Sequence, residues 1–446
     1  MRHSSFMEAR VANSTARWAI WAAITIASGI LVWGAVRHAV AQHWANASNP
    51  DQWMRAAELE PSNAENWYRL GRYRQLDFEH TDIPLAISFY GRATEINPVS
   101  ALYWMDLAGA YETNRQYSQA EQAFRTAQQD YPISAEVAWR FGNFLLRQDR
   151  VDEGFQQIHH ALSVDPSLTM LAVSVCWRST QDIDRILASA LPEKPGVYWG
   201  AIGFFVDANQ PDQAVTVWKK LLATTAGTSL PLEKAYPLLD LLLNLGRAND
   251  ARDIWGQAIA AAGIQSDFGP GGSLIWNGGF ESDLLNGGLA WRYRPLDGVA
   301  MKFEEGDAHS GNRSLRVDFD GSSNVDFESI WQWVVVKPNT HYRFSAYLRS
   351  ADLTTDSGIF FQIEDHSHPT NPEQFKQDPT RSTPNVIATQ PWSLNDLEFV
   401  TGPDTQLLRI VLRRTPSGRF GNKISGTAWV DDVSLVPAPM SAVANP

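Results

Sequence analysis

The chain has 446 residues, of which 44% are hydrophobic and 19% charged, so it has enough apolar sequence for buried cores and too much for global disorder. Its net charge of −12 repels phosphate backbones, and we therefore exclude nucleic acid as a partner. A single cysteine, Cys176, excludes an internal disulfide framework and a Cys-based zinc site.

An uncharged apolar segment lies near the N-terminus, at residues 18–36 (WAIWAAITIASGILVWGAV). As a helix it is about 28 Å long, which is enough to cross the hydrocarbon core of a bilayer. Tryptophans stand near both of its ends, and the preceding residues 1–17 are basic. These features predict a single-pass inner (cell) membrane helix, with residues 1–17 as a cytoplasmic tail and most of the chain periplasmic or extracellular.

A cleaved signal peptide is the alternative for this segment, because Ala39-Val40-Ala41 resembles a cleavage site. The apolar run is longer than that of an ordinary signal peptide, and Arg37 lies between the run and the site. We favour the uncleaved anchor, and whether the segment is cleaved stays open at this point.

A helical repeat occupies residues 44–262. Prolines recur at intervals of 34 residues, at Pro98, Pro132 and Pro166. Between the first two, large residues and alanines stand at Trp104, Leu107, Tyr111, Ala120, Phe124 and Ala127. This order and spacing resemble the tetratricopeptide repeat, in which large residues fill the space between two antiparallel helices and proline ends the second helix.

The repeat pattern predicts five helix pairs over residues 63–262, the last two of them degenerate, after an incomplete unit at residues 53–61. The resemblance implies a superhelix whose concave groove docks a protein partner, although the sequence identifies no groove residue. The alternative is that the array is a spacer without a groove ligand.

Helical spacing stops near residue 263. Residues 263–273 are rich in glycine and predict a linker or entry turn, residues 274–437 alternate in short runs typical of an antiparallel β-sandwich, and residues 438–446 form a flexible tail. The predicted strands are 274–280, 290–293, 299–303, 314–319, 330–336, 341–349, 359–365, 396–400, 407–414 and 428–435. We predict a surface loop at residues 365–392. The predicted fold is therefore multi-domain: a transmembrane helix, an all-α tetratricopeptide superhelix and an all-β jelly-roll sandwich.

Four motifs of the sandwich region, taken in order, resemble the jelly-roll carbohydrate-binding modules attached to xylanases and β-glucanases, which have a galactose-binding-like fold. They are NGGFE at 277–281, HSGNRSLRV at 309–317, VKPNTHYRFSAYLRS at 336–350 and VDDVSL at 430–435. Trp392 and Phe399, which lie between the third and the fourth motif, match as well. The resemblance implies a glycan ligand. It also implies a structural calcium, whose matching ligands are Glu281 and Asp432, with Asp307 as a third candidate.

Strand alternation selects a set of candidate sugar-binding side chains. They would share one outer face if their strands align in one sheet: Trp331, Trp333, Arg343, Tyr347, Arg349 and Gln362. Indole rings stack on the C–H faces of a pyranose, and amide or guanidinium groups hydrogen-bond its hydroxyls. The alternative is that these side chains pack under residues 365–392 or against the repeats.

Motifs of enzymes are missing from the sequence: it has no GxSxG elbow, phosphate loop, dinucleotide fingerprint or HExxH. We therefore expect a non-catalytic, membrane-anchored interaction protein. Its repeats would dock a protein partner and its sandwich would bind a glycan, as an accessory to cell-surface polysaccharide synthesis or export. The alternative is a structural assembly scaffold whose sandwich binds protein and no sugar.

Overall fold

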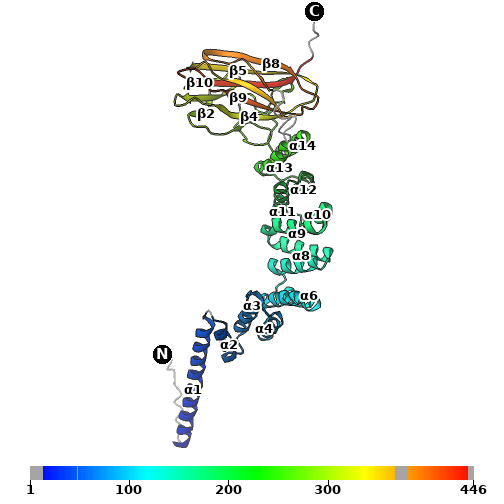
Figure 1. Cartoon of the computed structure of the whole chain (residues 1–446), viewed down its shortest axis with the longest axis vertical. Coiled ribbons are helices and arrows are strands. Elements are labelled where there is room, and N and C mark those ends of the chain that lie inside the picture. Colours follow the sequence, from blue (N-terminus) through cyan, green and yellow to red (C-terminus); the bar gives the residue numbers. More distant parts are fainter. Residues whose placement is uncertain (1–13, 48, 367–379, 440–446) are drawn as a thin grey trace, which may run out of the picture. The chain divides into compact units, whose positions relative to one another are not determined.

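The structure is a computed structural model that describes residues 14–47, 49–366 and 380–439. It divides into two compact units, Met1–Pro192 and Glu193–Pro446. The first holds helices α1 to α10, and the second holds helices α11 to α14 and all the described strands (Figure 1). The predicted fold class, helical repeats followed by a β-sandwich, is confirmed. The predicted cytoplasmic tail lies mostly outside the described residues, as does most of the predicted C-terminal tail.

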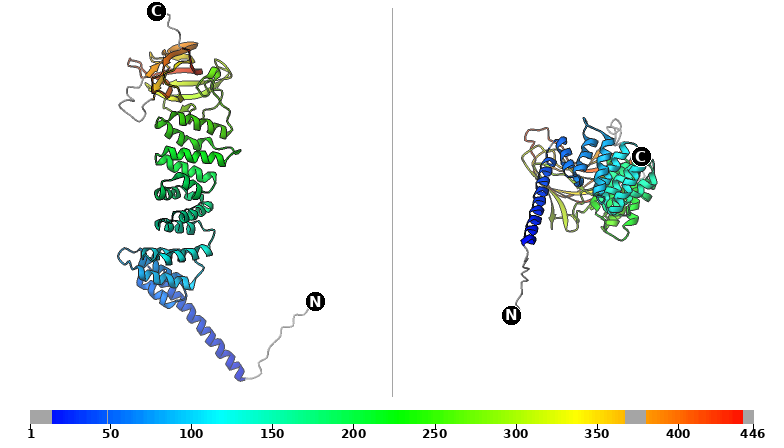
Figure 2. Two further views of the ribbon diagram at one scale, coloured as in Figure 1. Left: turned by 90° about the vertical axis from the view of Figure 1, so that its right-hand side faces the viewer. Right: turned by 90° about the horizontal axis from the view of Figure 1, so that it is seen from below.

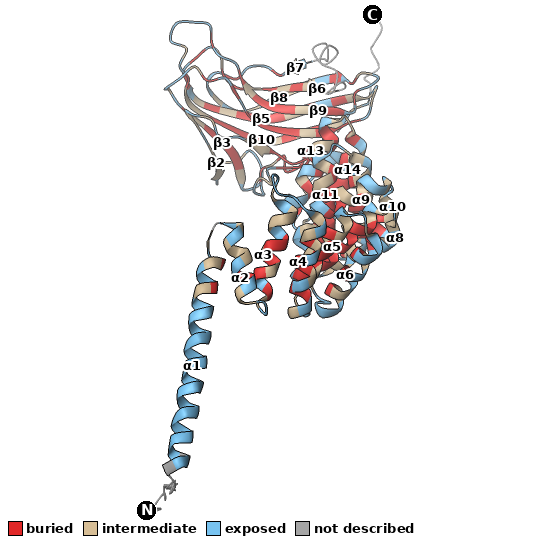
Figure 3. Cartoon of the chain, turned by 60° about the horizontal axis from the view of Figure 1, so that its bottom comes forward, coloured by how far each residue is buried: buried red, intermediate tan, exposed pale blue. Residues whose placement is uncertain are grey.

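Helix α1 (Ser14–Ala45) contains the predicted membrane segment and continues beyond it. The stretch Arg17–Ala45 has a mean hydropathy of 2.0, so α1 is long and apolar enough for a membrane span or a signal sequence. The residues of its apolar part are exposed (Figure 3). Its last turns contact α2 (Pro50–Leu59) and α3 (Ala64–Leu76): Ala41 is buried, and His38 Nδ1 lies 2.8 Å from Glu60 Oε1.

Antiparallel helix pairs make up the rest of the first unit (Figure 2). Most large side chains at the repeat positions are buried between the helices, as predicted, while Trp104 and Tyr111 are partly buried. Gly71 lets the first helix of one pair approach the second closely, because a Cβ at this position would lie only 2.7 Å from the ring of Tyr90. The pairs are α3 with α4 (Ile83–Ile96), α5 (Ala101–Thr113) with α6 (Tyr117–Asp130), α7 (Ala135–Arg147) with α8 (Val151–Val164), and α9 (Thr169–Thr180) with α10 (Ile183–Ser189).

The pair α9–α10 was not predicted, and it raises the number of pairs in the described residues to six. Its second helix has only seven residues and does not carry the repeat spacing, so the sequence pattern breaks there. Cys176 lies on α9 and is fully buried, and this burial raises the pKa of its thiol to about 12. The other two pairs belong to the second unit: α11 (Pro195–Asp207) with α12 (Pro211–Thr224), and α13 (Tyr236–Asn244) with α14 (Ala248–Ala262).

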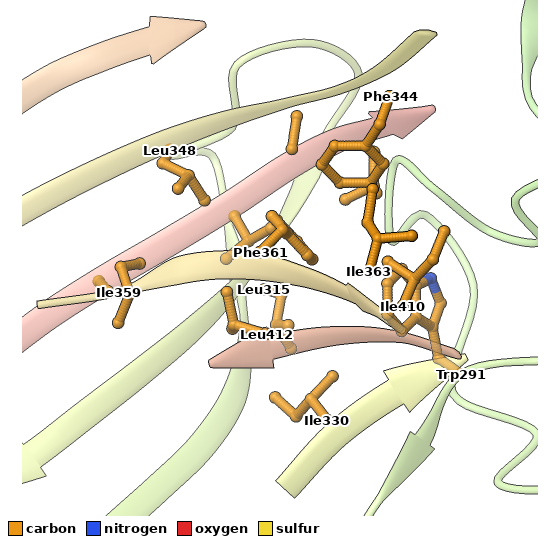
Figure 4. Packing of buried hydrophobic residues seen from close by; sticks show 14 of the residues in the cluster. Trp291, Leu315, Ile330, Phe344, Leu348, Ile359, Phe361, Ile363, Ile410 and Leu412 are labelled. Atoms are coloured by element: carbon orange, nitrogen blue, oxygen red, sulfur yellow. The ribbon is translucent and has the colours of Figure 1, made fainter. Parts of the chain in front are cut away.

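Two five-stranded antiparallel sheets form the sandwich. Sheet I has the order β1 (Arg292–Tyr293), β4 (Phe327–Val335), β9 (Leu407–Arg414), β6 (Phe360–Asp365), β7 (Thr380–Ser382). Sheet II has the order β2 (Val299–Glu305), β3 (Arg313–Asp320), β10 (Ser425–Pro437), β5 (His341–Leu353), β8 (Ala388–Val400). Alternate side chains of both sheets meet in one apolar core (Figure 4), which follows from the two-residue period of a strand.

One strand prediction and one loop prediction are wrong. Residues 274–280 do not form a strand, because Asn277 (φ 48°) and Phe280 (φ 54°) adopt left-handed backbone conformations that turn the chain. The segment 365–392 is not one loop, since β7 and the start of β8 lie within it. Residues 367–379 of that prediction lie outside the described part of the chain.

The last helix pair packs directly on the sandwich within the second unit. The ring of Trp255 lies against Gly288, where a Cβ would come within 2.3 Å, and meets Trp276 edge to face at 5.5 Å. The ring of Tyr236 packs in the same way on Gly287. An ion pair adds to these contacts, since Arg292 Nη2 lies 2.5 Å from Asp240 Oδ1. The predicted linker 263–273 therefore connects two elements that are in contact, and the boundary between the compact units lies earlier in the chain, after Pro192.

Candidate functional site

The six predicted sugar-binding residues divide between the two sheets, so the prediction of one shared face is wrong. Trp331, Trp333 and Gln362 belong to sheet I, on β4 and β6. Arg343, Tyr347 and Arg349 belong to β5 of sheet II. The outer faces of a sandwich point in opposite directions, and the chain crosses from one sheet to the other between β4 and β5. Alternation shows on which side of its own strand a residue lies, but not which sheet the strand joins.

A row of three aromatic or charged side chains crosses the outer face of sheet I. The strand register places Trp333 beside Arg409, and Arg409 beside Glu364. Arg409 Nη1 lies 3.1 Å from Glu364 Oε2, and Gln362 Nε2 donates to Glu364 Oε1 at 2.7 Å. The row therefore combines an indole ring, a cation and a carboxylate that accepts hydrogen bonds.

Glu364 is an ionised acceptor in this row. Burial alone would raise its pKa, but the Arg409 guanidinium and the His366 imidazole, whose Nε2 lies 3.8 Å from Glu364 Oε2, outweigh burial and lower the pKa of this carboxyl. Glu364 and Arg409 were not among the predicted site residues. Glu364 lies two positions after Gln362 and shares its side of β6, so alternation alone indicates it. Arg409 is found only from the pairing of β9 with β4 and β6.

The two tryptophans of sheet I differ in what covers them. Trp331 is only 7% exposed, and the guanidinium groups of Arg294 and Arg409 lie 5.0 and 5.4 Å from its ring centroid. Trp333 is half-buried and meets the ring of His366 edge to face at 4.6 Å. Of the two indoles that the structure describes on this face, Trp333 is therefore the more exposed.

On sheet II the predicted residues are engaged with one another and with a loop. The ring of Tyr347 stacks on that of His309, with centroids 3.4 Å apart. Arg349 forms an ion pair with Asp307, and its guanidinium lies 4.5 Å from the centroid of Trp429, which is 6% exposed. The faces of these aromatic rings are therefore occupied by protein side chains.

Arg343 also has a partner on sheet II, since its Nη2 lies 2.8 Å from Asp396 Oδ2 on β8. This ion pair is largely exposed, and such pairs contribute little to stability. The structure places Arg343 away from Trp333 and leaves its predicted role in sugar binding a prediction.

The predicted calcium ligands are occupied by hydrogen-bond donors. Glu281 Oε1 accepts from the backbone N–H groups of Asn312 (2.8 Å) and Arg313 (3.1 Å). Asp432 Oδ1 accepts from the Ser310 hydroxyl at 2.6 Å, and Asp307 pairs with Arg349 instead. In the described ranges no group of three or more His, Cys, Asp or Glu side chains is arranged to hold a metal. These carboxylates tie the loop between β2 and β3 to the strand ends, and a calcium does not fit this arrangement.

Asp431, next to the predicted ligand Asp432, is a buried carboxyl on the outer side of β10. Its Oδ2 accepts from the backbone N–H groups of His309 (2.8 Å) and Ser310 (3.1 Å). The residue is 0% exposed, and burial raises its pKa to about 6 in spite of these bonds. The burial of Asp431 could not be predicted from the sequence, because the DDV motif does not show which of its two aspartates is buried.

We expect Asp431 to make the folded state less stable as the pH rises through about 6. The folded state holds the proton more tightly than the unfolded chain, whose carboxyl has a pKa of about 4. Its contribution is therefore largest below about pH 4 and is lost above about pH 6, with a slope of at most about 1.4 kcal/mol per pH unit. Asp431→Asn should remove this slope, measured by denaturant unfolding of the full chain.

Asp404→Asn provides the control for this experiment, because it removes a carboxylate from an exposed position of the same sandwich. Equal slopes for the wild type and Asp431→Asn between about pH 4 and about pH 6 would show that the carboxyl does not titrate in this range.

Comparison with known proteins assigns the sandwich to a class. Residues 272–417 match the protein-family model described as a carbohydrate binding domain, which covers about a third of the chain and includes Trp333, Glu364 and Arg409. The C-terminal region is thus a carbohydrate-binding-type domain joined to a tetratricopeptide-like helical region. A search of curated proteins gave no significant match.

Solved structures show weaker likenesses. A structure of MamA is 15% identical over 39% of this chain and 85% of its own, with a TM-score of 0.26. YrrB, whose structure is described as a TPR protein with an unusual peptide-binding site, is 14% identical over 40% of this chain and 95% of its own (TM-score 0.28). A family 16 carbohydrate binding module is 17% identical over 36% of this chain and 99% of its own (TM-score 0.25). These likenesses are too weak to define a function.

Proposed function

We propose that the chain is a membrane-anchored, non-catalytic interaction protein whose sandwich binds a glycan and whose helical region docks a protein. The observation that carries the glycan assignment is the row of Trp333, Arg409 and Glu364 on sheet I, within the region that matches the carbohydrate binding domain. The assignment of protein docking rests on the tetratricopeptide-like helix pairs of the first unit.

The row has the chemistry that a sugar ring requires. Trp333 offers an apolar ring to the C–H groups of a pyranose, while the Glu364 carboxylate accepts and Arg409 donates hydrogen bonds to hydroxyls. Gln362 adds an amide next to Glu364. Adjacent strands are about 4.8 Å apart, so the three side chains of the row span about the width of one or two sugar rings.

We propose that α1 remains attached as the anchor, with its basic N-terminal flank in the cytoplasm. Support comes from Ala41, which lies in the cleavage-like sequence and is 1% exposed because it packs against the array. Cleavage there would remove the contact between His38 and Glu60. A glycan-binding domain held at a membrane suits accessory work in making or exporting a cell-surface polysaccharide.

A structural scaffold is the second candidate, and the burial of Trp331 favours it. With only 7% of Trp331 exposed, sheet I offers one accessible indole where a sugar-binding cleft often has several. In this alternative the sandwich binds a protein surface and no sugar.

Trp333→Ala is expected to weaken glycan binding by about tenfold or more, because central aromatic contacts dominate most interfaces. The measurement is a glycan array probed with the full chain in detergent, followed by calorimetry with the best ligand. Trp392→Ala is the matched control: it removes a half-buried indole from sheet II and should leave binding unchanged. Loss of binding in Trp392→Ala alone would move the site to sheet II, and no binding to any glycan would favour the scaffold.

A further inference from the structure

The end of α1 folds back along α2, and this contact fixes which edge of the first unit lies nearest the apolar segment. Trp53 Nε1, early in α2, donates to the carbonyl oxygen of Ala47, which follows α1. His38 Nδ1, about two turns before the end of α1, lies 2.8 Å from Glu60 Oε1 at the other end of α2. The two helices therefore run antiparallel, and the C-terminal end of α2 lies beside the residues that follow the apolar segment.

The turn after α2 lies close to the level at which the apolar segment ends. His38, which contacts the end of α2, is two residues past Val36, or about 3 Å along the helix. Burial of Ala45 and a hydrogen bond from Arg69 Nη1 to its carbonyl oxygen (2.8 Å) hold α1 against the array. If α1 crosses a bilayer, the turn at residues 60–63 therefore lies at the lipid headgroups.

Every second turn of the array lies on this same edge, because successive helices alternate in direction. The first three such turns are residues 60–63, 97–100 and 131–134. They are built alike: Trp67 Nε1 donates to the carbonyl oxygen of Pro61, and Trp104 Nε1 donates to that of Pro98. Figure 3 shows these ends of α2, α4 and α6 on the side of the array from which α1 projects. The three turns are called the lower edge below.

Apolar side chains of the lower edge are open to solvent. Val99 is 63% exposed, Ile133 is 79% exposed and Tyr131 is 49% exposed. Val99 and Ile133 occupy the same repeat position, directly after the proline of their turn. Residues on protruding turns can insert among lipid headgroups without a pocket of matching shape, and tyrosine is favoured at that level of a bilayer.

Charge does not attract the lower edge to an anionic surface. Glu58 and Asp130 are exposed beside it, and neither has a basic partner in the part of the chain that the structure describes. Arg92, near the end of α4, pairs with Glu95 at 2.9 Å. Contact with a bilayer therefore has to come from apolar insertion, which neither requires anionic lipid nor weakens when salt is added.

We propose that the lower edge rests on the bilayer that α1 crosses, with Val99, Tyr131 and Ile133 among the lipid headgroups. This rests on the proposed anchor and adds a second membrane contact to it. The continuity of α1 with the array favours lipid as the occupant, because α1 brings the bilayer to this edge. Transmembrane helices tilt by about 0–40°, and a tilt of α1 within this range would lower the edge onto the headgroups.

The experiment measures the contact of labelled positions with lipid, using the full chain in phosphatidylcholine vesicles. Cys176 is fully buried, so a thiol-reactive fluorophore labels an introduced cysteine selectively. Ile133→Cys places the fluorophore on the lower edge. Phe78→Cys is the matched control, because Phe78 is 98% exposed in the turn between α3 and α4, on the opposite edge. Phosphatidylcholine with a nitroxide near its headgroup should quench position 133 about twofold or more relative to position 78.

Val99→Asp tests whether the contact is apolar. It replaces an inserted side chain by a carboxylate, so it should shift the edge away from the bilayer by about tenfold and weaken the quenching at position 133. Leu76→Asp is its control: Leu76 is 65% exposed at the end of α3, on the opposite edge, and the quenching should remain. Quenching that requires anionic lipid or falls with added salt would overturn the apolar contact.

Val32→Cys distinguishes failure of the edge contact from failure of the anchor, because Val32 lies within the apolar segment and is 63% exposed. Quenching at position 32 without quenching at position 133 overturns the edge contact and leaves the anchor intact. If position 32 is not quenched either, the anchor is overturned with it. Equal quenching at positions 133 and 78 shows contact without a preferred edge, which also overturns the proposal.

Discussion

Replacing Trp255 by alanine is expected to lower the free energy of unfolding of the second unit by about 3–5 kcal/mol, the usual range for removing a fully buried indole. Trp255 is 2% exposed and its ring fills the space above Gly288. Without it, the edge-to-face contact with Trp276 is lost and the helix pair α13–α14 no longer fits the sandwich. Unfolding of the full chain in denaturant, followed by circular dichroism, measures the change.

The same variant should also separate the melting of the helices from that of the sandwich. In the wild type the ion pair between Arg292 and Asp240 and the contact between Trp255 and Gly288 join the two elements, so they should unfold together. Trp392 is a half-buried tryptophan of sheet II. Trp392→Ala should therefore lower the free energy of unfolding by clearly less and leave helices and sandwich unfolding in a single transition. A Trp255→Ala chain that unfolds like the wild type would contradict a stable contact between helices and sandwich.

Arg414→Met should lower the free energy of unfolding by a similar amount, about 3–5 kcal/mol. Arg414 is 0% exposed, and its guanidinium donates to five acceptors at the end of the sandwich. They are the carbonyl oxygens of Val325, Ser357 and Asn422, the Asn324 side-chain oxygen and the Thr355 hydroxyl. Methionine fills much of the volume but leaves the carbonyl oxygens of Val325 and Asn422 and the Thr355 hydroxyl without this donor, while the Asn324 and Ser357 oxygens keep one from Ser417 and Thr355. Each unsatisfied buried group costs about 1–3 kcal/mol.

Two further variants sharpen the Arg414 experiment. Arg414→Lys retains the charge and three donors, so it should recover part of the lost stability. Arg343→Met removes an arginine whose ion pair with Asp396 is largely exposed, and it should change stability by about 1 kcal/mol or less. If both methionine variants have the same small effect, the hydrogen bonds of Arg414 do not hold the strand ends together.

The helical region was well predicted because its signal is local. Repeat positions such as Phe124 and Tyr90 are buried as the spacing required, since the same helix-to-helix contact recurs in each unit. The pair α9–α10 escaped prediction because α10 is too short to carry the pattern.

The candidate site was predicted only in part, for a different reason. Alternation placed Trp331 and Trp333 outside the core of sheet I correctly, but it joined them to Tyr347, which belongs to the opposite sheet. Membership of a sheet is decided by long-range pairing, which leaves no periodic trace in the sequence. The same is true of Arg409, whose place beside Trp333 follows from the register of β9 on β4.

The direct packing of α13–α14 on the sandwich has a mechanical consequence. A polymer bound to sheet I and pulled by its own growth or movement would load β4 and its neighbour β1, which carries Arg292. Arg292 pairs with Asp240, and Trp255 packs on Gly288. Because these contacts join the sandwich directly to α13 and α14, the force would be transmitted to the helices and would not be taken up by a flexible linker. Through these contacts, a force on a molecule bound to the sandwich would act on the helices of the same unit.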